Sequence, residues 1–380
     1  MKILVTGGAG FIGSFLVDRL VRDGHEVRIY DNLDSQVHLG STTRHQKKPP
    51  YLNKEAEFIY GDVRDRESLA KALEGIEVVF HEAAAVGVGQ SQYQIKHYMD
   101  VNTGGTANLL DILANGKHRV QKIMVAASMS SYGEGGYRCA KCGDMRPPLR
   151  TEEQLAQKKW ELLCSKCHTV LTPIPIPETA ERQCQSIYAL SKLDQEEMVL
   201  NFGKTYNIPA VALRYFNVYG PRQSLSNPYT GVAAIFMSRI KNNHSPVVYE
   251  DGLQTRDFIS VLDIVEANIL AMTKPEADYQ AFNVGSGKIL SILDIAKVLI
   301  ELYRRVADPS SVEPHVTYQF RKGDIRHCIA DISKIETKLG FKPKVSFQEG
   351  MKELIRYSQE VEAIDLFDQA SQELKARGLA

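Results

Sequence analysis

Tyr188 and Lys192, four residues apart, are the side chains of this sequence best suited to acid–base chemistry. If both lie on one face of a helix, the lysine ammonium lies near the phenol. A free tyrosine has a pKa of about 10, and lowering it to near 7 requires roughly 4 kcal/mol of preferential phenolate stabilisation. A nearby cation could supply part of this energy, which would make the tyrosine a general base toward an alcohol. Taken alone, this spacing is more often structural than catalytic.

A glycine-rich loop near the N-terminus favours a catalytic role for this pair over a structural one. Gly7, Gly10 and Gly13 follow a predicted strand and open a predicted helix. Small residues let a backbone approach a pyrophosphate, and the N-terminus of a helix offers amide donors and the positive end of its dipole. The loop therefore predicts a dinucleotide site, the alternative being a tight turn that binds no ligand. A nicotinamide cation in such a site could join Lys192 in lowering the pKa of Tyr188.

Two aspartates follow the next strands. Asp31 stands eighteen residues beyond Gly13, where a carboxylate accepts hydrogen bonds from the adenosine ribose and repels a 2′-phosphate. This favours NAD over NADP. Asp62 could reach the adenine edge, or it could cap a helix that begins near Arg64, and the spacing fits both interpretations equally well.

The elements that must position these groups alternate strands and helices. We expect strands at 2–6, 26–30, 57–60, 77–81, 122–126, 210–214 and 281–284, and helices at 11–22, 67–73, 101–114, 188–206, 261–273, 292–302 and after 347. Repeated strand–helix units predict an α/β fold with a Rossmann-type, doubly wound parallel sheet.

The predicted domains follow from where this alternation breaks. Residues 1–132 and 181–219 form the NAD-binding Rossmann domain, and 133–180 form a cysteine-rich insertion. Residues 220–380 are mainly a smaller α/β substrate lobe, with some elements returning to the Rossmann domain. The polar stretch 33–50 is too long for an ordinary connection and could be a lid or substrate loop. The tail beyond Glu360 is predicted to be a solvated amphipathic helix.

The insertion contains two Cys-x-x-Cys pairs separated by 21 residues. The four cysteines are Cys139, Cys142, Cys164 and Cys167. This arrangement suits tetrahedral zinc in a zinc-ribbon-like fold, the alternative being four reduced thiols. Four thiolates leave no open coordination position, so the zinc would be structural, and His168 is expected at the surface. Cys184 and Cys328 lack a partner motif and are expected to be buried filler.

The overall composition excludes several classes of function. The chain has 380 residues with 46 basic and 46 acidic side chains, which argues against nucleic acid as a partner. No apolar run approaches the roughly 18 residues of a membrane span. The first strand begins at Lys2, without room for a signal peptide, so we expect a cytoplasmic protein.

Several motifs together resemble those of the extended short-chain dehydrogenase/reductase family, in its NAD-dependent nucleotide-sugar epimerase and dehydratase branch. They are the glycine loop, the segments His81–Ala85 and Ser128–Gly133, the Tyr188/Lys192 pair, and the segments Arg214–Arg222, Gln254–Phe258 and Arg321–Asp324. The resemblance covers nearly the whole chain apart from the insertion.

The resemblance implies a role for each matching residue. Tyr188, Lys192 and Ser128 would be catalytic. The residues expected to bind the cofactor are Gly7, Gly10, Phe11, Ile12, Gly13, Asp31, Asn32, Asp62, Val63, Ala83, Ala84, Ala85, Asn102, Tyr188, Lys192 and Tyr215. Those expected to bind the nucleotide-diphosphate sugar are Ser128, Ser130, Asn217, Arg222, Arg256, Arg321 and Asp324.

Two positions favour an epimerase over a dehydratase. A dehydratase of this family has an Asp-Glu directly after the catalytic hydroxyl residue, whereas this chain has Met129 and Ser130. We therefore expect oxidation at C4 of the sugar, with tightly bound NAD that takes a hydride and returns it to the other face. The resemblance also implies a homodimer formed through the helices after Val101 and Tyr188.

The substrate is narrowed by two further segments. The stretch after Asp31, with Ser35-Gln36-Val37-His38, and the cysteine insertion are similar to those of dTDP-L-rhamnose 4-epimerases. UDP-hexose 4-epimerases and one-way nucleotide-sugar dehydrogenases or reductases are the enzymatic alternatives. A protein that senses NAD and uses the insertion to contact a partner is the non-enzymatic alternative, although a sensor does not need Tyr188, Lys192 and Ser128.

Overall fold

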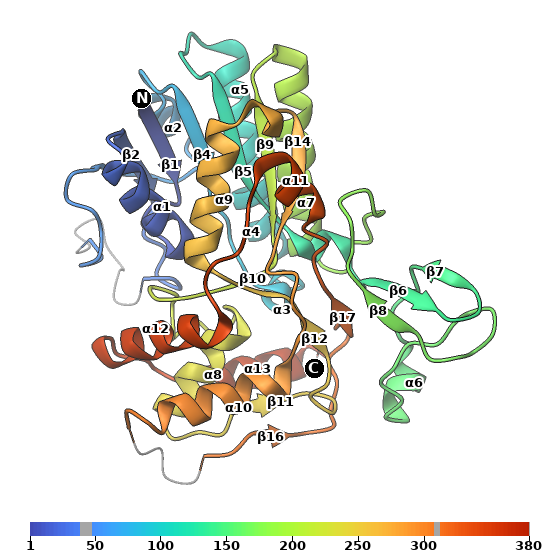
Figure 1. The fold of residues 1–380 in the computed structure, drawn as a ribbon. Helices are drawn as coiled ribbons and strands as arrows, with labels where there is room; N and C mark the ends of the chain where they lie inside the picture. The colour runs from blue at the N-terminus through green and yellow to red at the C-terminus, as the bar shows by residue number, and fades with distance from the viewer. Residues whose placement is uncertain (39–47, 308–311, 380) are drawn as a thin grey trace.

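A parallel sheet dominates the computed structural model, which describes residues 1–38, 48–307 and 312–379 (Figure 1). In these ranges the sheet has seven strands in the order β14-β9-β5-β4-β1-β2-β3. Their bounds are β1 Lys2–Thr6, β2 Glu26–Asp31, β3 Glu57–Tyr60, β4 Val78–His81, β5 Lys122–Ser128, β9 Ala210–Tyr215 and β14 Gln280–Val284. Every neighbouring pair is parallel, so the predicted doubly wound sheet is confirmed.

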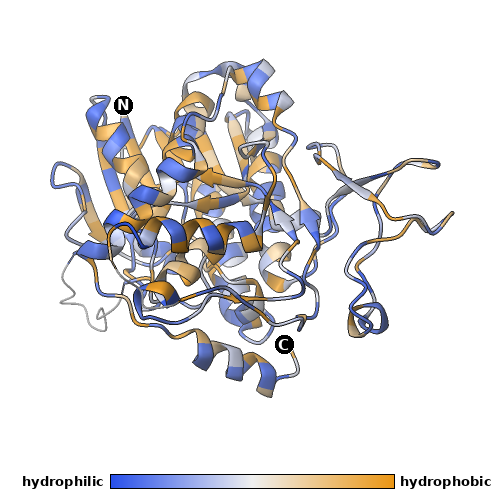
Figure 2. Cartoon of the chain, turned by 60° about the horizontal axis from the view of Figure 1, so that its bottom comes forward, coloured by the Kyte–Doolittle hydropathy of each residue, from blue (hydrophilic) through white to orange (hydrophobic). Residues whose placement is uncertain are grey.

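Helices cover both faces of this sheet because its strands are apolar on both sides. In β1, Ile3 and Val5 pack into one core and Leu4 packs into the other, as the two-residue period of a strand requires. The first core includes helices α1 (Phe11–Arg22) and α9 (Val261–Thr273). The second includes α2 (Arg66–Ala72), α5 (Gly105–Asn115) and α7 (Ile187–Tyr206). Figure 2 shows the apolar colour concentrated in the strands and in the helices beside them.

Two local details differ from the sequence prediction. The helix expected over 101–114 begins with a π-helical turn, Met99–Gly104, before α5. The cap of α2 is Asp65, whose side chain accepts a hydrogen bond from the Ser68 amide. The suggestion that Asp62 caps this helix is therefore wrong.

A smaller lobe lies below the sheet in Figure 1. Its core is formed by α8 (Val232–Lys241), α10 (Ile292–Tyr303) and α12 (Phe347–Glu360). The short strands β11 (Val247–Val248) and β16 (His315–Val316) pair beside them. Elements beyond residue 220 also belong to the large sheet, because β14 is its edge strand and α11 (Ser333–Leu339) packs on β14.

The cysteine-rich insertion projects to one side of the molecule (Figure 1). It contains an antiparallel sheet in the order β7-β6-β8, with a short helix, α6. Their bounds are β6 Gly136–Cys139, β7 Gly143–Met145, β8 Thr172–Ile174 and α6 Glu152–Ala156. Its own apolar core is small and includes two of the cysteines among Tyr137, Leu162 and Leu171.

The C-terminal tail is not simply a solvated surface helix. It ends in α13 (Phe367–Ala376), which buries Ala370 and Leu374. Leu374 lies in the wall of the large cavity described below. Of the polar stretch 33–50, residues 39–47 lie outside the described residues. Among the described helices, none combines the length and apolar character needed to cross a membrane.

Candidate active site

A cavity of about 840 Å³ lies between the carboxyl ends of the sheet strands and the smaller lobe. This edge of a doubly wound sheet is where ligands bind, next to the point at which the strand order reverses between β1 and β4. The cavity wall combines the glycine loop, the ends of β2, β4 and β5, the start of α7, and segments of the smaller lobe. Most residues predicted from separate motifs therefore meet in one place.

The glycine loop is as tightly packed as a pyrophosphate-binding turn requires. Gly7 has a φ of +67°, and a Cβ there would lie 2.8 Å from the backbone nitrogen of Ala83. A Cβ on Gly13 would lie 2.3 Å from the carbonyl oxygen of Gly7. Neither position can carry a larger side chain, so the backbone and the α1 N-terminus stay open toward the cavity. This cradle fits a dinucleotide, with Phe11 and Ile12 beside it in the cavity wall.

Asp31 lies at the end of β2 and faces the cavity. Its carboxylate accepts hydrogen bonds from the backbone amides of Ala9, at 3.0 Å, and Leu33, at 2.8 Å. Burial raises the pKa of this carboxyl group, and the nearby His38 and the two amide bonds oppose the shift. The amides fix its direction, and each oxygen keeps a free lone pair for a ribose hydroxyl.

Asp62 faces the same end of the cavity, together with Asn32 and Val63. It accepts a hydrogen bond from the Asn32 side chain at 2.9 Å and forms an ion pair with Arg64 at 2.7 Å. Its pKa falls to about 2, because the hydrogen bonds from Arg64 and Asn32 outweigh the effect of burial. An ionised acceptor at this place suits the amino edge of an adenine.

Tyr188 and Lys192 both line the cavity from the first turns of α7. Ser186 caps this helix by accepting a hydrogen bond from the Ala189 amide, and the Tyr188 amide donates to Ser91 Oγ at 3.0 Å. The Lys192 ammonium donates to Gln195 Oε1 at 2.6 Å. The backbone and side-chain bonds thus fix the direction of the helix at Tyr188 and Lys192.

The electrostatics of the pair differ from the sequence expectation. Burial raises the pKa of Tyr188, and a hydrogen bond with Ser128 opposes this shift. Burial lowers the pKa of Lys192 to about 8, although Glu82 and Glu196 oppose it. The protein's own groups leave the pKa of the Tyr188 phenol above its usual value, so the predicted lowering to near 7 would depend on a bound nicotinamide cation beside Lys192. Ser128, at the end of β5, is the neighbour that stabilises the phenolate.

Glu82 is a cavity residue to which sequence reasoning gave no role. It follows β4, lines the cavity, and accepts a hydrogen bond from the Tyr215 phenol at 3.0 Å. Burial raises its pKa to about 7, although Tyr215 and Lys192 oppose this shift. The available signal was an acid between a histidine and three alanines at the end of a buried strand.

Ala83, Ala84 and Ala85 line the cavity, but Asn102 stands behind them. The Asn102 side chain is fully buried and bonds to both backbone groups of Ala85, at 2.7 and 3.1 Å. It also donates to Ser191 Oγ at 2.9 Å. Asn102 therefore supports the backbone of Ala85 from behind the cavity wall, and its contact with the cofactor stays a prediction.

Asn217 and Ser130 also face the cavity. The side-chain oxygen of Asn217 is buried and has no hydrogen-bond partner among the residues that the structure describes. Because buried polar atoms are normally paired, this oxygen is a candidate ligand contact. Ser130 Oγ donates to Ser128 Oγ at 2.9 Å, so the two hydroxyl groups form a pair in the wall.

Arg256, Arg321 and Asp324 also line the cavity, as predicted. Arg256 donates to the carbonyl oxygens of Ile325 and Arg326 at 2.7 and 3.0 Å, which leaves part of its guanidinium free. Arg321 pairs with Asp324 at 2.8 Å. The guanidinium groups suit the oxygens of a diphosphate.

Arg222 is not among the residues that line this cavity. Its guanidinium forms an ion pair with Asp18 at 2.7 Å and lies 4.2 Å from the ring centre of Phe15. The structure therefore places it against α1 and outside the cavity wall, and its role in substrate binding stays a prediction.

The four cysteines of the insertion form one cluster. Their sulfur atoms all lie within 4.8 Å of one another, and Cys139 and Cys164 are buried. His168 is exposed, as expected. Cys328 is buried in a small apolar cluster, and Cys184 is half-buried. Such a sulfur cluster is compatible with one tetrahedral metal ion.

The fold and the cavity define an NAD-dependent enzyme of the extended short-chain dehydrogenase/reductase type. Residues 3–160 match the model of the NAD dependent epimerase/dehydratase family, and residues 169–354 match that of GDP-mannose 4,6 dehydratase. A dTDP-L-rhamnose 4-epimerase from Burkholderia thailandensis is 34% identical over 93% of this chain and 93% of its own. The chain belongs to the NAD-dependent epimerase/dehydratase family.

Solved structures agree with this assignment. A UDP-glucose 4-epimerase with UDP-glucose from Thermotoga maritima superposes with a TM-score of 0.74 at 31% identity, over 95% of this chain and 99% of that one. A Thermus thermophilus UDP-glucose 4-epimerase in complex with NAD gives a TM-score of 0.72 at 27% identity, over 95% and 100% of the two chains. The family's cofactor, NAD, fits the cradle described above.

Proposed function

We propose that this enzyme inverts the configuration at C4 of a nucleotide-linked sugar. The observation that carries the proposal is the meeting of Tyr188, Lys192 and Ser128 in the wall that also contains the glycine loop. Tyr188 would take the proton of the 4-hydroxyl group, and Ser128 would hydrogen-bond to the same oxygen. Bound NAD would accept a hydride from C4 and return it to the opposite face of the ring. The keto sugar must turn within the cavity between these two steps.

The dinucleotide contacts are part of this proposal. The glycine loop, with Phe11 and Ile12, would hold the pyrophosphate, and Asp31 would hold the adenosine ribose. Asn32, Asp62 and Val63 would surround the adenine. Ala83, Ala84, Ala85 and Tyr215 would line the rest of the cofactor. On the substrate side, Arg256, Arg321 and Asp324 would bind the nucleotide diphosphate, and Ser130 and Asn217 would lie nearer the sugar.

The side chains after Ser128 support an epimerase over a dehydratase. Removal of water next to the keto group needs an additional acid and base. Met129 has no titratable group, and Ser130 is already paired with Ser128. A dehydratase remains the second candidate because the family model over 169–354 is that of a GDP-mannose 4,6 dehydratase.

For the substrate we propose dTDP-L-rhamnose, interconverted with dTDP-6-deoxy-L-talose. The resemblance of the segment after Asp31 and of the insertion supports it, together with the 34% identity to the Burkholderia enzyme. A UDP-hexose is the alternative, because relatives named UDP-glucose 4-epimerase match at similar coverage. Incubation of the enzyme with both kinds of nucleotide sugar, followed by NMR of the sugar, distinguishes them.

We also propose that Cys139, Cys142, Cys164 and Cys167 bind a structural zinc ion. The short distances between their sulfur atoms support this proposal. The apolar core of the insertion is small, so metal binding would contribute part of its folding free energy. Metal analysis of protein purified without chelators tests the proposal, and a zinc content near zero would overturn it.

A homodimer through α5 and α7, a cytoplasmic location and the domain bounds stay predictions. The exposed Leu190 on α7, 45% accessible, supports a contact through this helix. Light scattering of the purified protein tests the dimer.

A further inference from the structure

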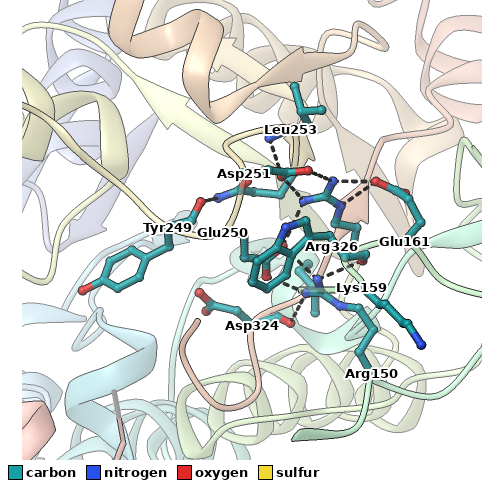
Figure 3. Close-up of polar contacts among 12 residues, drawn as sticks. Arg150, Lys159, Glu161, Tyr249, Glu250, Asp251, Leu253, Asp324 and Arg326 are labelled. Atoms are coloured by element: carbon teal, nitrogen blue, oxygen red, sulfur yellow. Dashed lines mark hydrogen bonds and ion pairs between the residues drawn. The ribbon is translucent and has the colours of Figure 1, made fainter. Parts of the chain in front are cut away.

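The cysteine-rich insertion contacts the segments that carry the proposed diphosphate-binding groups. Two side chains of the insertion that take part in this contact are Arg150 and Glu161 (Figure 3). They meet Glu250 and Arg326, which lie near Arg256 and Asp324 in the sequence. The contact is therefore made beside the substrate end of the cavity and not beside the cofactor cradle.

Arg150 forms the first half of the contact. Its guanidinium donates to both carboxylate oxygens of Glu250 at 2.8 Å, and the two side chains are only 1% and 3% exposed. It also donates to the carbonyl oxygen of Asp324 at 3.1 Å. A buried two-bond pair has a defined direction, so Arg150 fixes the chain at Glu250 and at Asp324 together.

Glu161 forms the second half. It accepts hydrogen bonds from Arg326, whose side chain is fully buried, and contacts His327 Nε2 at 3.3 Å. Arg326 also pairs with Glu250 at 2.9 Å and with Asp251 at 2.7 Å. Figure 3 shows these acids gathered around the guanidinium of Arg326. Breaking a buried pair costs more than a surface pair because a charge is left without its partner.

The bonds continue from this cluster to the cavity wall. Arg256 donates to the carbonyl oxygen of Arg326 at 3.0 Å, and His327 contacts Thr255 Oγ1 at 2.7 Å. The insertion, the segment before Arg256 and the segment after Asp324 are thus held as one unit. A shift of the insertion would move both diphosphate-binding segments.

We propose that Arg150 and Glu161 are positioning residues for the nucleotide-diphosphate end of the substrate. This inference rests on the proposed function, because it takes Arg256, Arg321 and Asp324 as the groups that bind the diphosphate. The insertion then determines affinity for the nucleotide and leaves the hydride and proton steps at Tyr188 untouched.

Glu161→Gln tests this proposal. Arg326 keeps its ion pairs with Glu250 and Asp251 in this variant, so its buried charge does not lose all of its partners. We expect a KM for the nucleotide sugar about tenfold higher, with kcat within about twofold of wild type and bound NAD retained. Arg150→Lys keeps the charge but loses the two-bond geometry, and it should raise KM in the same direction. A fall in kcat at unchanged KM, or loss of NAD, would overturn the inference.

The matched control is Asp144→Asn. Asp144 pairs with Arg138 in the same insertion, but both side chains are exposed, at 55% and 62%. This variant should behave as wild type. If Glu161→Gln also behaves as wild type, the insertion does not position the substrate.

Calorimetric binding of dTDP and UDP separates this inference from the proposed function, since it requires no turnover. If Glu161→Gln binds the nucleotides more weakly than wild type, and wild type epimerises no sugar, the proposed 4-epimerase activity is overturned and the positioning role is supported. Normal epimerisation with equal nucleotide binding by wild type and Glu161→Gln would overturn only the positioning role. Wild-type protein that binds neither nucleotide would overturn both.

Discussion

The phenol of Tyr215 donates a hydrogen bond to Glu82 Oε1 at 3.0 Å in the wall of the active-site cavity. Burial raises the pKa of this carboxyl group from 4.5 to about 7. Because the folded-state pKa is above that of the unfolded chain, the protonated group stabilises the fold below about pH 4.5. That contribution is lost as the pH rises through about 7.

Glu82→Gln should therefore flatten part of the pH dependence of stability. We expect the free energy of unfolding of the wild type to fall relative to that of the variant between about pH 4.5 and pH 7. Urea unfolding of both proteins across this window measures the difference. Parallel curves would mean that Glu82 does not take up a proton in this range.

Tyr188→Phe should abolish epimerisation. The variant keeps the ring, which lies 6.4 Å from that of Tyr98, but loses the hydroxyl group that we propose takes the proton. We expect a loss of about 10²–10⁴-fold or more in kcat, with NAD still bound. Turnover by NMR and the NAD released on denaturation are the two measurements. Turnover near the wild-type rate would remove Tyr188 from the mechanism.

Ser128→Ala should slow the reaction more than Ser130→Ala. Ser128 opposes the burial-raised pKa of the Tyr188 phenol, whereas Ser130 contacts Ser128 Oγ. We expect kcat to fall about 10²-fold for the first variant, the typical size for loss of one polar group at a reacting oxygen. Ser130→Ala is the control. Equal losses of kcat in both variants would indicate that the two hydroxyl groups only maintain the structure of the cavity wall.

For the proposed zinc site, Cys164→Ser should abolish zinc binding and unfold the insertion. Cys164 is fully buried in the small core with Tyr137 and Leu162, so little apolar packing remains to hold the strands. Cys184→Ser, outside the cluster, is the matched control. Metal content and limited proteolysis check both variants, and a variant with full zinc content would exclude Cys164 as a ligand.

Much of the Rossmann part could be predicted because its signals are local. The helix over 11–22 and the strand over 57–60 match α1 and β3 residue for residue, since apolar periodicity and a strand-ending acid mark them directly. The glycine loop could be predicted because its glycines are required sterically. Neighbouring backbone lies so close to Gly7 and Gly13 that no Cβ fits at either position.

The positions that differ from the sequence expectation depend on contacts between distant segments of the chain. Arg222 is the last residue of the motif Arg214–Arg222. Its ion-pair partner Asp18 lies on α1, and the motif gives no information about that helix. The tail was interpreted from its charge, whereas Leu374 packs beside Gly89, far away in the sequence. Glu82 gains its raised pKa from burial beside Tyr215, a relationship that spacing cannot indicate.

Reversible oxidation at C4 of the sugar can be followed in a single experiment. Purified enzyme is incubated with dTDP-L-rhamnose, and NMR of the sugar is followed together with absorbance of NADH. We expect a mixture of the two C4 epimers without net accumulation of NADH. Stoichiometric NADH with a stable keto sugar, or conversion of a nucleotide hexose to a 4-keto-6-deoxy sugar with loss of water, would contradict it.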